Sequence, residues 1–191
     1  MANLTITATA PEIENALQGA LRLERLRNPT PLYKAWAQYL EKLAVQAFKT
    51  ETAPFGSAWD PLRPITRALD KGPPARPRKG ILRASGTLYD TVVGQVLPDG
   101  AQVGTNQKVG AYSLGAIHQF GAVVPITPKS RGYFRHQFRS TNNDGWQKLS
   151  NAKNDFVVIP ARPFLPMDDQ GNILPDAVEE LTALTRDYIL G

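Results

Sequence analysis

Residues 30–49 have the sequence TPLYKAWAQYLEKLAVQAFK, the clearest helical pattern in this chain of 191 residues. Large apolar side chains recur there every three or four positions, a spacing that places them on one side of a helix. They are Leu32, Trp36, Tyr39, Leu40, Leu43, Ala47 and Phe48. We expect Thr30 to cap this helix and Pro31 to take its first position, where a backbone N–H would be unpaired in any case. Such a stripe is typical of a buried core rather than of a ligand site.

Two further helices are predicted at the ends of the chain. Residues 11–27 carry apolar side chains on one side and stop at Asn28-Pro29, which separates them from the first helix. Residues 175–190 open with Pro175, and their apolar side chains also recur at helical spacing. The chain is therefore expected to have a helix pair over residues 11–50 and a C-terminal helix over residues 175–190.

Strand signals lie in the middle of the chain. The segment VLPDGAQVG predicts a hairpin whose strands cover residues 92–97 and 101–105, with a tight turn between them. Residues 132–138 and 155–159 are candidate strands, and the polar stretch between them suits a long exposed loop. Helices at both ends of a run of short strands predict an α+β fold. We expect a small, mostly antiparallel sheet packed by the helix pair and the C-terminal helix, with long exposed loops.

One domain of residues 1–191 is expected, because a chain of this length with 42% hydrophobic residues can bury a core. The hairpin and sheet core should lie within residues 81–174. Residues 71–79 hold three prolines, four basic residues and, prolines apart, no apolar residue larger than alanine, so we expect an exposed basic arm. No run of about 18 apolar residues predicts a transmembrane helix, and the first residues do not resemble a signal peptide.

The residue inventory excludes several kinds of chemistry. The chain has no cysteine, so disulfides, thiolate catalysis and cysteine-ligated metals are ruled out. It contains no phosphate-binding loop, no dinucleotide-binding glycine motif and no zinc-protease motif. No metal ligand spacing and no cofactor site stand out, and we expect neither group.

A hydrolase would need an improvised active site. Ser113 and His118 are the nearest approach to a catalytic pair, but Ala111 stands where a nucleophile elbow needs its first glycine. We expect His118 instead to be partly buried, with its ring nitrogens hydrogen-bonded to backbone or a neighbour. The adjacent acids Asp168 and Asp169 precede Gln-Gly-Asn and predict a turn.

Charge is unevenly distributed along the chain, whose formal net charge is +5. Residues 63–83 carry seven basic residues and one acid, residues 129–139 carry four basic residues and no acid, and the last 24 residues carry six acids and one arginine. This asymmetry either attracts nucleic acid or pairs the basic loops of one copy with the acidic end of another, unless both basic stretches are simply solvated loops. The basic residues assigned to an interface are Arg76, Arg78, Lys79, Arg131 and Arg135.

The segment IPARPFL, residues 159–165, holds three prolines within residues 160–166 and should be extended and stiff. Phe164 and Leu165 are expected to anchor it, either in a core or in a neighbouring subunit. Arg162 makes either a structural salt bridge or a contact across an interface, and the sequence leaves both open. We include all three residues among the candidates for a subunit or partner interface.

Four motifs stand in a recognisable order: Trp59-Asp60-Pro61-Leu62, residues 81–88 (ILRASGTL), residues 103–106 leading to residues 117–121 (IHQFG), and residues 159–165. This set resembles the phage virion-morphogenesis family, the tail-completion proteins of tailed bacteriophages, over nearly the whole chain. The residues that carry the resemblance, to which we assign structural roles, are Trp59, Leu62, Ser85, Gly86, Leu88, Gly104, His118, Gln119, Phe120, Gly121, Pro160 and Pro163.

The resemblance implies a structural protein without catalytic residues, metal or cofactor. Family members resemble ring-forming components, tail terminators or neck proteins, that complete the head-proximal end of the tail and join it to the head. By analogy with tail-terminator rings, a homohexamer is expected. The implied partners are further copies of the chain, the tail-tube protein and the head–tail connector proteins, with no membrane. The expected location is the tail or neck of the virion after assembly in the host cytoplasm.

Two roles for the basic stretches follow from a ring. They either contact neighbouring subunits or line a lumen where they touch passing DNA without sequence preference. Strong phosphate binding would hinder passage, which favours subunit contact for at least one stretch. The alternative function is a basic nucleic-acid-binding protein, against which stands the lack of a recognition-helix pattern or an aromatic platform beside the basic residues.

Overall fold

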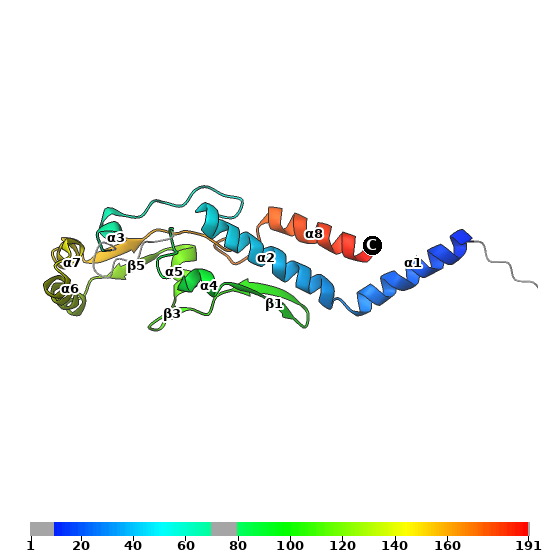
Figure 1. Ribbon diagram of the computed structural model, residues 1–191, viewed down its shortest axis with the longest axis horizontal. Coiled ribbons are helices and arrows are strands. Elements are labelled where there is room, and N and C mark those ends of the chain that lie inside the picture. Colours follow the sequence, from blue (N-terminus) through cyan, green and yellow to red (C-terminus); the bar gives the residue numbers. More distant parts are fainter. Residues whose placement is uncertain (1–9, 70–79, 191) are drawn as a thin grey trace, which may run out of the picture.

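The computed structural model describes residues 10–69 and 80–190, and in this part of the chain it has eight helices and six strands (Figure 1). The helices are α1 (Ala10–Arg27), α2 (Thr30–Thr50), α3 (Pro64–Leu69), α4 (Thr87–Asp90), α5 (Leu114–Phe120), α6 (Pro128–Thr141), α7 (Asp144–Ser150) and α8 (Pro175–Leu190). The predicted α+β fold, with N-terminal helices and a C-terminal helix, is confirmed. The molecule is elongated, with α1 at one end and α6 and α7 at the other (Figure 1). The predicted basic arm, with Arg76, Arg78 and Lys79, lies outside the described residues.

Helix α2 lies between α8 and a hairpin formed by β1 (Val93–Leu97) and β2 (Gly100–Gly104) (Figure 1). Because two of its faces are covered, its buried residues differ in part from the predicted stripe; they are Leu32, Ala37, Leu40, Ala44, Ala47 and Phe48. Trp36, Tyr39 and Leu43 are only half-buried. The helix begins one residue earlier than predicted, since Pro29 occupies the capping position and no side chain caps it.

The hairpin pairs β1 (Val93–Leu97) with β2 (Gly100–Gly104) in antiparallel register, and Leu97 faces Gly100 across the predicted turn. Gly94 lets the hairpin approach α2 closely, because a Cβ there would collide with the backbone carbonyl of Ala37. The Gly94 N–H donates to the Glu41 carboxylate at 2.7 Å. Gly94 of the hairpin and Ala37 of α2 therefore set the distance between helix and hairpin.

Two smaller antiparallel sheets complete the strands described. β3 (Lys108–Val109) pairs with β4 (Tyr112–Ser113), and β5 (Ala122–Pro125) pairs with β6 (Phe156–Ile159). The strand predicted at residues 155–159 is confirmed as β6.

The strand predicted at residues 132–138 is wrong, because this segment lies in α6. A capping box starts that helix: the Thr127 hydroxyl accepts the Ser130 N–H at 3.2 Å, and the Ser130 hydroxyl accepts the Thr127 N–H at 2.9 Å. The polar stretch that follows is likewise not all loop. It contains α7, whose capping residue Asn143 accepts the Gly145 N–H at 2.8 Å.

The core gathers around the C-terminal half of α2. The Phe48 ring contacts three other aromatic rings at centroid distances of 5.0 to 5.7 Å; they belong to Trp59, Tyr89 and Phe164. Such pairs add about 0.5–1.5 kcal/mol each beyond the burial of their area. The other buried members are Ala44, Ala47, Ile81, Leu88 and Val92. This core is compact, and α1, α6 and α7 lie outside it.

Candidate assembly surfaces

Three of the four motifs meet at one junction in the structure. The buried side chain of Gln119, in α5, accepts the backbone N–H groups of Phe164 and Leu165, each at 3.0 Å, and donates to the Leu165 carbonyl at 3.3 Å. The Arg162 N–H donates to the His118 carbonyl at 2.6 Å. The Gln119 side chain thus supplies hydrogen-bond partners to the backbone of this extended segment, in the way that a neighbouring strand would. Buried backbone N–H and C=O groups need such partners.

The Trp59 motif joins the same junction. The Trp59 indole donates to the Pro163 carbonyl at 2.8 Å, while the Arg162 guanidinium donates to the carbonyls of Asp60 at 3.0 Å and Pro61 at 3.3 Å. Arg162 is 5% exposed and Phe164 is fully buried, whereas Leu165 is half-buried against the core. These three residues, predicted at a subunit or partner interface, therefore pack within their own protomer. For Phe164 and Leu165 the structure shows the core alternative.

The remaining motif residues are spread around this junction. Gly121 has φ of 76°, and a Cβ there would lie 2.9 Å from the Ile159 carbonyl oxygen, so a side chain would be both strained and crowded. Gly86, with φ of 85°, precedes α4. Leu88 is buried in the core and Leu62 packs against it. The hydroxyls of Ser85 and Thr87 form a hydrogen bond, and Gly104 is the last residue of β2. Pro160 is half-buried and Phe120 is exposed.

His118 is partly buried, as predicted, but its Nδ1 is buried without a hydrogen-bond partner in the described part of the chain. Burial, with a smaller contribution from the positive charge of Arg162, lowers the pKa of His118 to about 4. The ring is therefore neutral at neutral pH. It lies beside a cavity of about 350 Å³ that is lined mostly by apolar side chains, together with Ser85, Thr66 and Arg63.

The residues weighed for catalysis have local structural contacts. The Ser113 hydroxyl caps α5 by accepting the Ala116 N–H at 3.3 Å. Asp168 forms the predicted turn, in which its carboxylate accepts the N–H groups of Gln170 and Asn172 at 2.9 and 2.8 Å. The Asn172 side chain, also bonded to it, is the main cause of a lowered pKa for Asp168. Within residues 10–69 and 80–190, no cluster of three His, Asp or Glu side chains could hold a metal ion.

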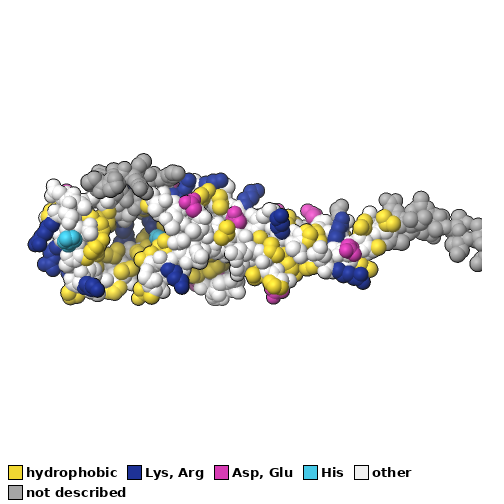
Figure 2. Space-filling model, turned by 60° about the horizontal axis from the view of Figure 1, so that its bottom comes forward, with side chains coloured by type: hydrophobic (Ala, Val, Ile, Leu, Met, Phe, Trp, Pro, Cys, Tyr) yellow, Lys and Arg dark blue, Asp and Glu magenta, His cyan; other side chains and the backbone are white. Residues whose placement is uncertain are grey.

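Several basic side chains lie on the surface at the end of the molecule formed by α6 and α7, among apolar and uncharged ones (Figure 2); we call this the basic α6 surface. The Arg131 guanidinium is held by contacts within its own chain. It donates hydrogen bonds to the carbonyls of Ser150 and Ala152 at 3.1 and 2.8 Å and forms a salt bridge with Asp155 at 3.0 Å. Arg135 is exposed, like the other basic residues of α6, Lys129, His136 and Arg139. Arg131 therefore shapes this end, and Arg135 belongs to its outer surface.

An aromatic cluster lies beside these basic residues, contrary to the sequence-based argument that none accompanies them. Phe134 stacks on Trp146 of α7 with centroids 5.9 Å apart, and Tyr133 meets the same ring edge-on. Tyr133 is 53% exposed. This arrangement could not be read from the sequence, because α7 was predicted as loop.

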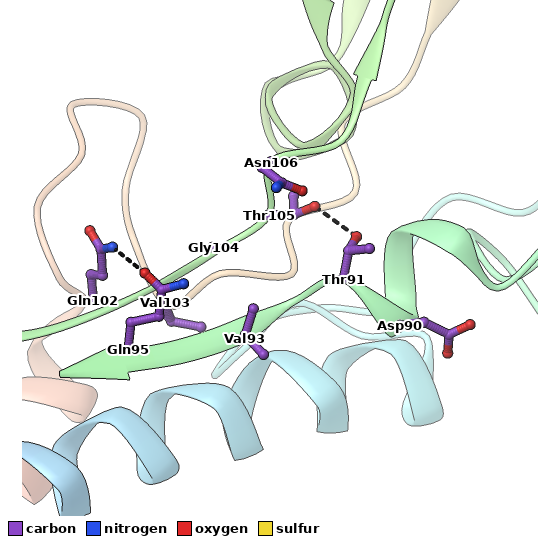
Figure 3. A pocket seen from close by; sticks show the side chains of 9 residues that line it. All are labelled: Asp90, Thr91, Val93, Gln95, Gln102, Val103, Gly104, Thr105 and Asn106. Carbon is purple, nitrogen blue, oxygen red and sulfur yellow. Dashed lines mark hydrogen bonds between the residues drawn. The ribbon is translucent and has the colours of Figure 1, made fainter.

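The outer side of the hairpin carries a polar groove of about 540 Å³ (Figure 3). Gln102 donates to the Gln95 side chain at 2.8 Å across the two strands, and the hydroxyls of Thr91 and Thr105 lie 2.9 Å apart. Among the residues that the structure describes, Asp90 is the charged residue that lines it. The groove therefore offers neutral hydrogen-bonding groups.

Helix α1 projects from the body (Figure 1). Four of its apolar side chains are exposed. They are Leu17, Leu21, Leu23 and Leu26, each between 43% and 60% exposed. Its last turn meets the end of α8, where Arg25 donates to the Ile189 carbonyl at 3.2 Å and the Tyr188 hydroxyl donates to the Asn28 carbonyl at 2.7 Å. Leu17 and Leu21 lie on one side of α1. Contiguous exposed apolar surfaces are typical of interaction sites.

Comparison with known proteins gives one family. The model of the phage virion morphogenesis family matches residues 9–183, most of the chain. No curated protein and no solved structure matches. The family supports a structural or assembly role in a bacteriophage virion and points away from an enzyme. None of the helices that the structure describes is long and apolar enough to span a bilayer.

Proposed function

The chain belongs to the phage virion morphogenesis family, and on that premise we propose that it is the subunit of a ring at the head-proximal end of the tail. The ring completes the tail and takes part in joining it to the head. The expected assembly is a homohexamer that contacts the tail-tube protein on one side and connector proteins on the other. The protein acts by binding and has no catalytic step.

The observation that supports this proposal most is the projecting helix α1 with its four exposed leucines. In a monomer these side chains would remain in water at a cost of about 25 cal/mol for each Å² of apolar surface. Covering them by another protein recovers that free energy. A subunit built to assemble has such a surface, whereas an enzyme acting alone has no use for it.

The charge distribution favours contacts between unlike faces. The α6 surface is basic, while α8 carries four acids, Asp176, Glu179, Glu180 and Asp187, against Arg186. Unlike faces that meet in successive copies form heterologous contacts, and these close into a ring when the rotation between copies allows. The charge pattern therefore supports a cyclic assembly better than a two-fold dimer.

The direct test is to mix the purified protein with tail tubes assembled from tail-tube protein and to image them by electron microscopy. We expect ring-shaped density at one end of each tube. Binding along the tube wall, or tubes with bare ends at saturating protein, would contradict the proposal. The control is the same tubes without the protein.

A second candidate, contact with DNA through the basic α6 surface, is favoured by exposed Tyr133 on the same helix as exposed Arg135 and Arg139. Basic residues neutralise phosphates and an exposed aromatic ring can stack on a base. Duplex binding that weakens steeply with salt, and weakens further in Arg135→Ala/Arg139→Ala, would support it. Arg186→Ala, which removes an arginine from acidic α8, is the matched control. Equal affinity of all three proteins would exclude this surface.

A further inference from the structure

An apolar groove runs between α8 and α2 on the side away from the hairpin. It has a volume of about 570 Å³, and its main apolar lining residues are Trp36, Ile173, Val178, Leu181 and Ile189. Ile173 and Val178 are each more than 40% exposed. Trp36, which lines the groove, has a buried Nε1 without a hydrogen-bond partner in the described residues. The groove is therefore a second apolar surface, separate from the leucines of α1.

Helix α1 does not occupy the groove of its own chain. It is joined to α2 by Asn28-Pro29, and the bonds from Tyr188 to Asn28 and from Arg25 to Ile189 hold its last turn at the tip of α8. From there it runs away from the body along the long axis of the molecule (Figure 1). Folding back onto its own groove would break both bonds, so another molecule is the natural source of an occupant.

The groove is long enough for the two leucines that share a side of α1. Leu17 and Leu21 are four residues apart, about 6 Å along a helix, and Val178 and Ile189 are eleven residues apart, about 17 Å.

We propose that α1 of one copy docks in the α2–α8 groove of the next copy, with its leucines on Trp36 and the apolar side chains of α8. This rests on the proposed ring, for which it supplies the subunit contact. Because α1 points away from its own groove, each copy gives a helix to one neighbour and receives a helix from the other. The contact is heterologous and repeats around a closed ring.

The absence of cysteine allows a clean cross-linking test in the full chain. Leu21→Cys and Thr182→Cys proteins, the second with its cysteine at the groove, are mixed and mildly oxidised. We expect disulfide-linked dimers at least tenfold in excess of those formed by Gln18→Cys mixed with Thr182→Cys, because Gln18 lies on the polar side of α1. Equal yields from the two mixtures would overturn the proposal. Concentration-independent cross-linking within single chains carrying both Leu21→Cys and Thr182→Cys would also overturn it.

Native mass separates this proposal from the ring itself. Leu17→Ala/Leu21→Ala should reduce the assembly to smaller species, and circular dichroism should remain unchanged because alanine preserves helix propensity. A ring that keeps its mass in this variant would leave the proposed function standing and overturn the docking. A wild-type protein that is monomeric with and without tail-tube protein would overturn both. Loss of tube binding with no loss of self-association would place α1 on the tube and also overturn the docking.

Discussion

The indole N–H of Trp59 donates to the carbonyl oxygen of Pro163 at 2.8 Å, across 104 residues of sequence. This bond ties the first family motif to the last. With the Arg162 contacts to the Trp59 loop, it fixes an extended proline-rich segment that has no strand partner beside it. These motif contacts lie within the protomer, and the assembly surfaces that we propose lie elsewhere, on α1, α6 and α8.

Trp59→Phe should destabilise the protomer by about 1–3 kcal/mol, because the ring is retained in part while the Pro163 carbonyl loses its partner. Denaturant unfolding measures this. A decrease in the free energy of unfolding of less than about 0.5 kcal/mol would mean that water replaces the indole as donor to the Pro163 carbonyl. The junction would then be accessible to solvent.

Gln119→Leu should cost more than Trp59→Phe. Leucine is similar in volume but pairs neither backbone N–H of Phe164 and Leu165, and each buried group left unpaired costs about 1–3 kcal/mol. Thermal and denaturant unfolding should both show the loss. Gln95→Leu, at an exposed position of the hairpin, is the matched control and should stay within about 0.5 kcal/mol of the wild type. Equal free energies of unfolding for Gln119→Leu and Gln95→Leu would contradict the role assigned to Gln119.

Trp36→Ala tests a revised expectation. From the sequence alone, the tryptophan belongs to the core and its truncation should cost about 3–5 kcal/mol. The structure places it half-buried at the α2–α8 groove, against Tyr33 at a centroid distance of 5.4 Å. We therefore expect a smaller loss in the protomer, about 1–3 kcal/mol, together with weaker assembly. Unfolding measured at a concentration where the protein is monomeric separates the two effects.

His118 should make stability depend on pH. The pKa of His118 is about 4 in the folded chain, below the ordinary value of 6.5. Between these two pH values the imidazole is therefore protonated in the unfolded chain and neutral in the folded chain. Stability should therefore be fully present above about pH 6.5 and fall as the pH drops toward 4, by at most about 1.4 kcal/mol per pH unit. His118→Asn should flatten this slope, and His136→Asn, at an exposed position, should not. Superimposable profiles for the wild type and His118→Asn would refute the assignment.

Parts of the fold could be predicted because their signals are local. The apolar spacing of residues 30–49, the turn before Gly100 and the opening proline of α8 each specify an element without reference to the rest of the chain. The α6 segment misled because Tyr133, Phe134 and Phe138 favour strands, whereas the capping box at Thr127 and Ser130 decides for a helix. That signal was present in the sequence.

The junction could be predicted only in part. The motifs identified Gln119, Arg162 and Trp59, but their partners lie 45 to 104 residues away, and tertiary packing brings them together. The aromatic cluster of α6 and α7 was missed because α7 was predicted as loop. The groove between α2 and α8 depends on which side of α2 each neighbour covers, and periodicity along one helix does not contain that information.

The most direct measurement is the native mass of the purified protein, by light scattering or native mass spectrometry, without and then with tail-tube protein. We predict a closed oligomer, a hexamer, formed either alone or when the tube protein is added. A monomer that persists at every concentration and ignores the tube protein would contradict the ring.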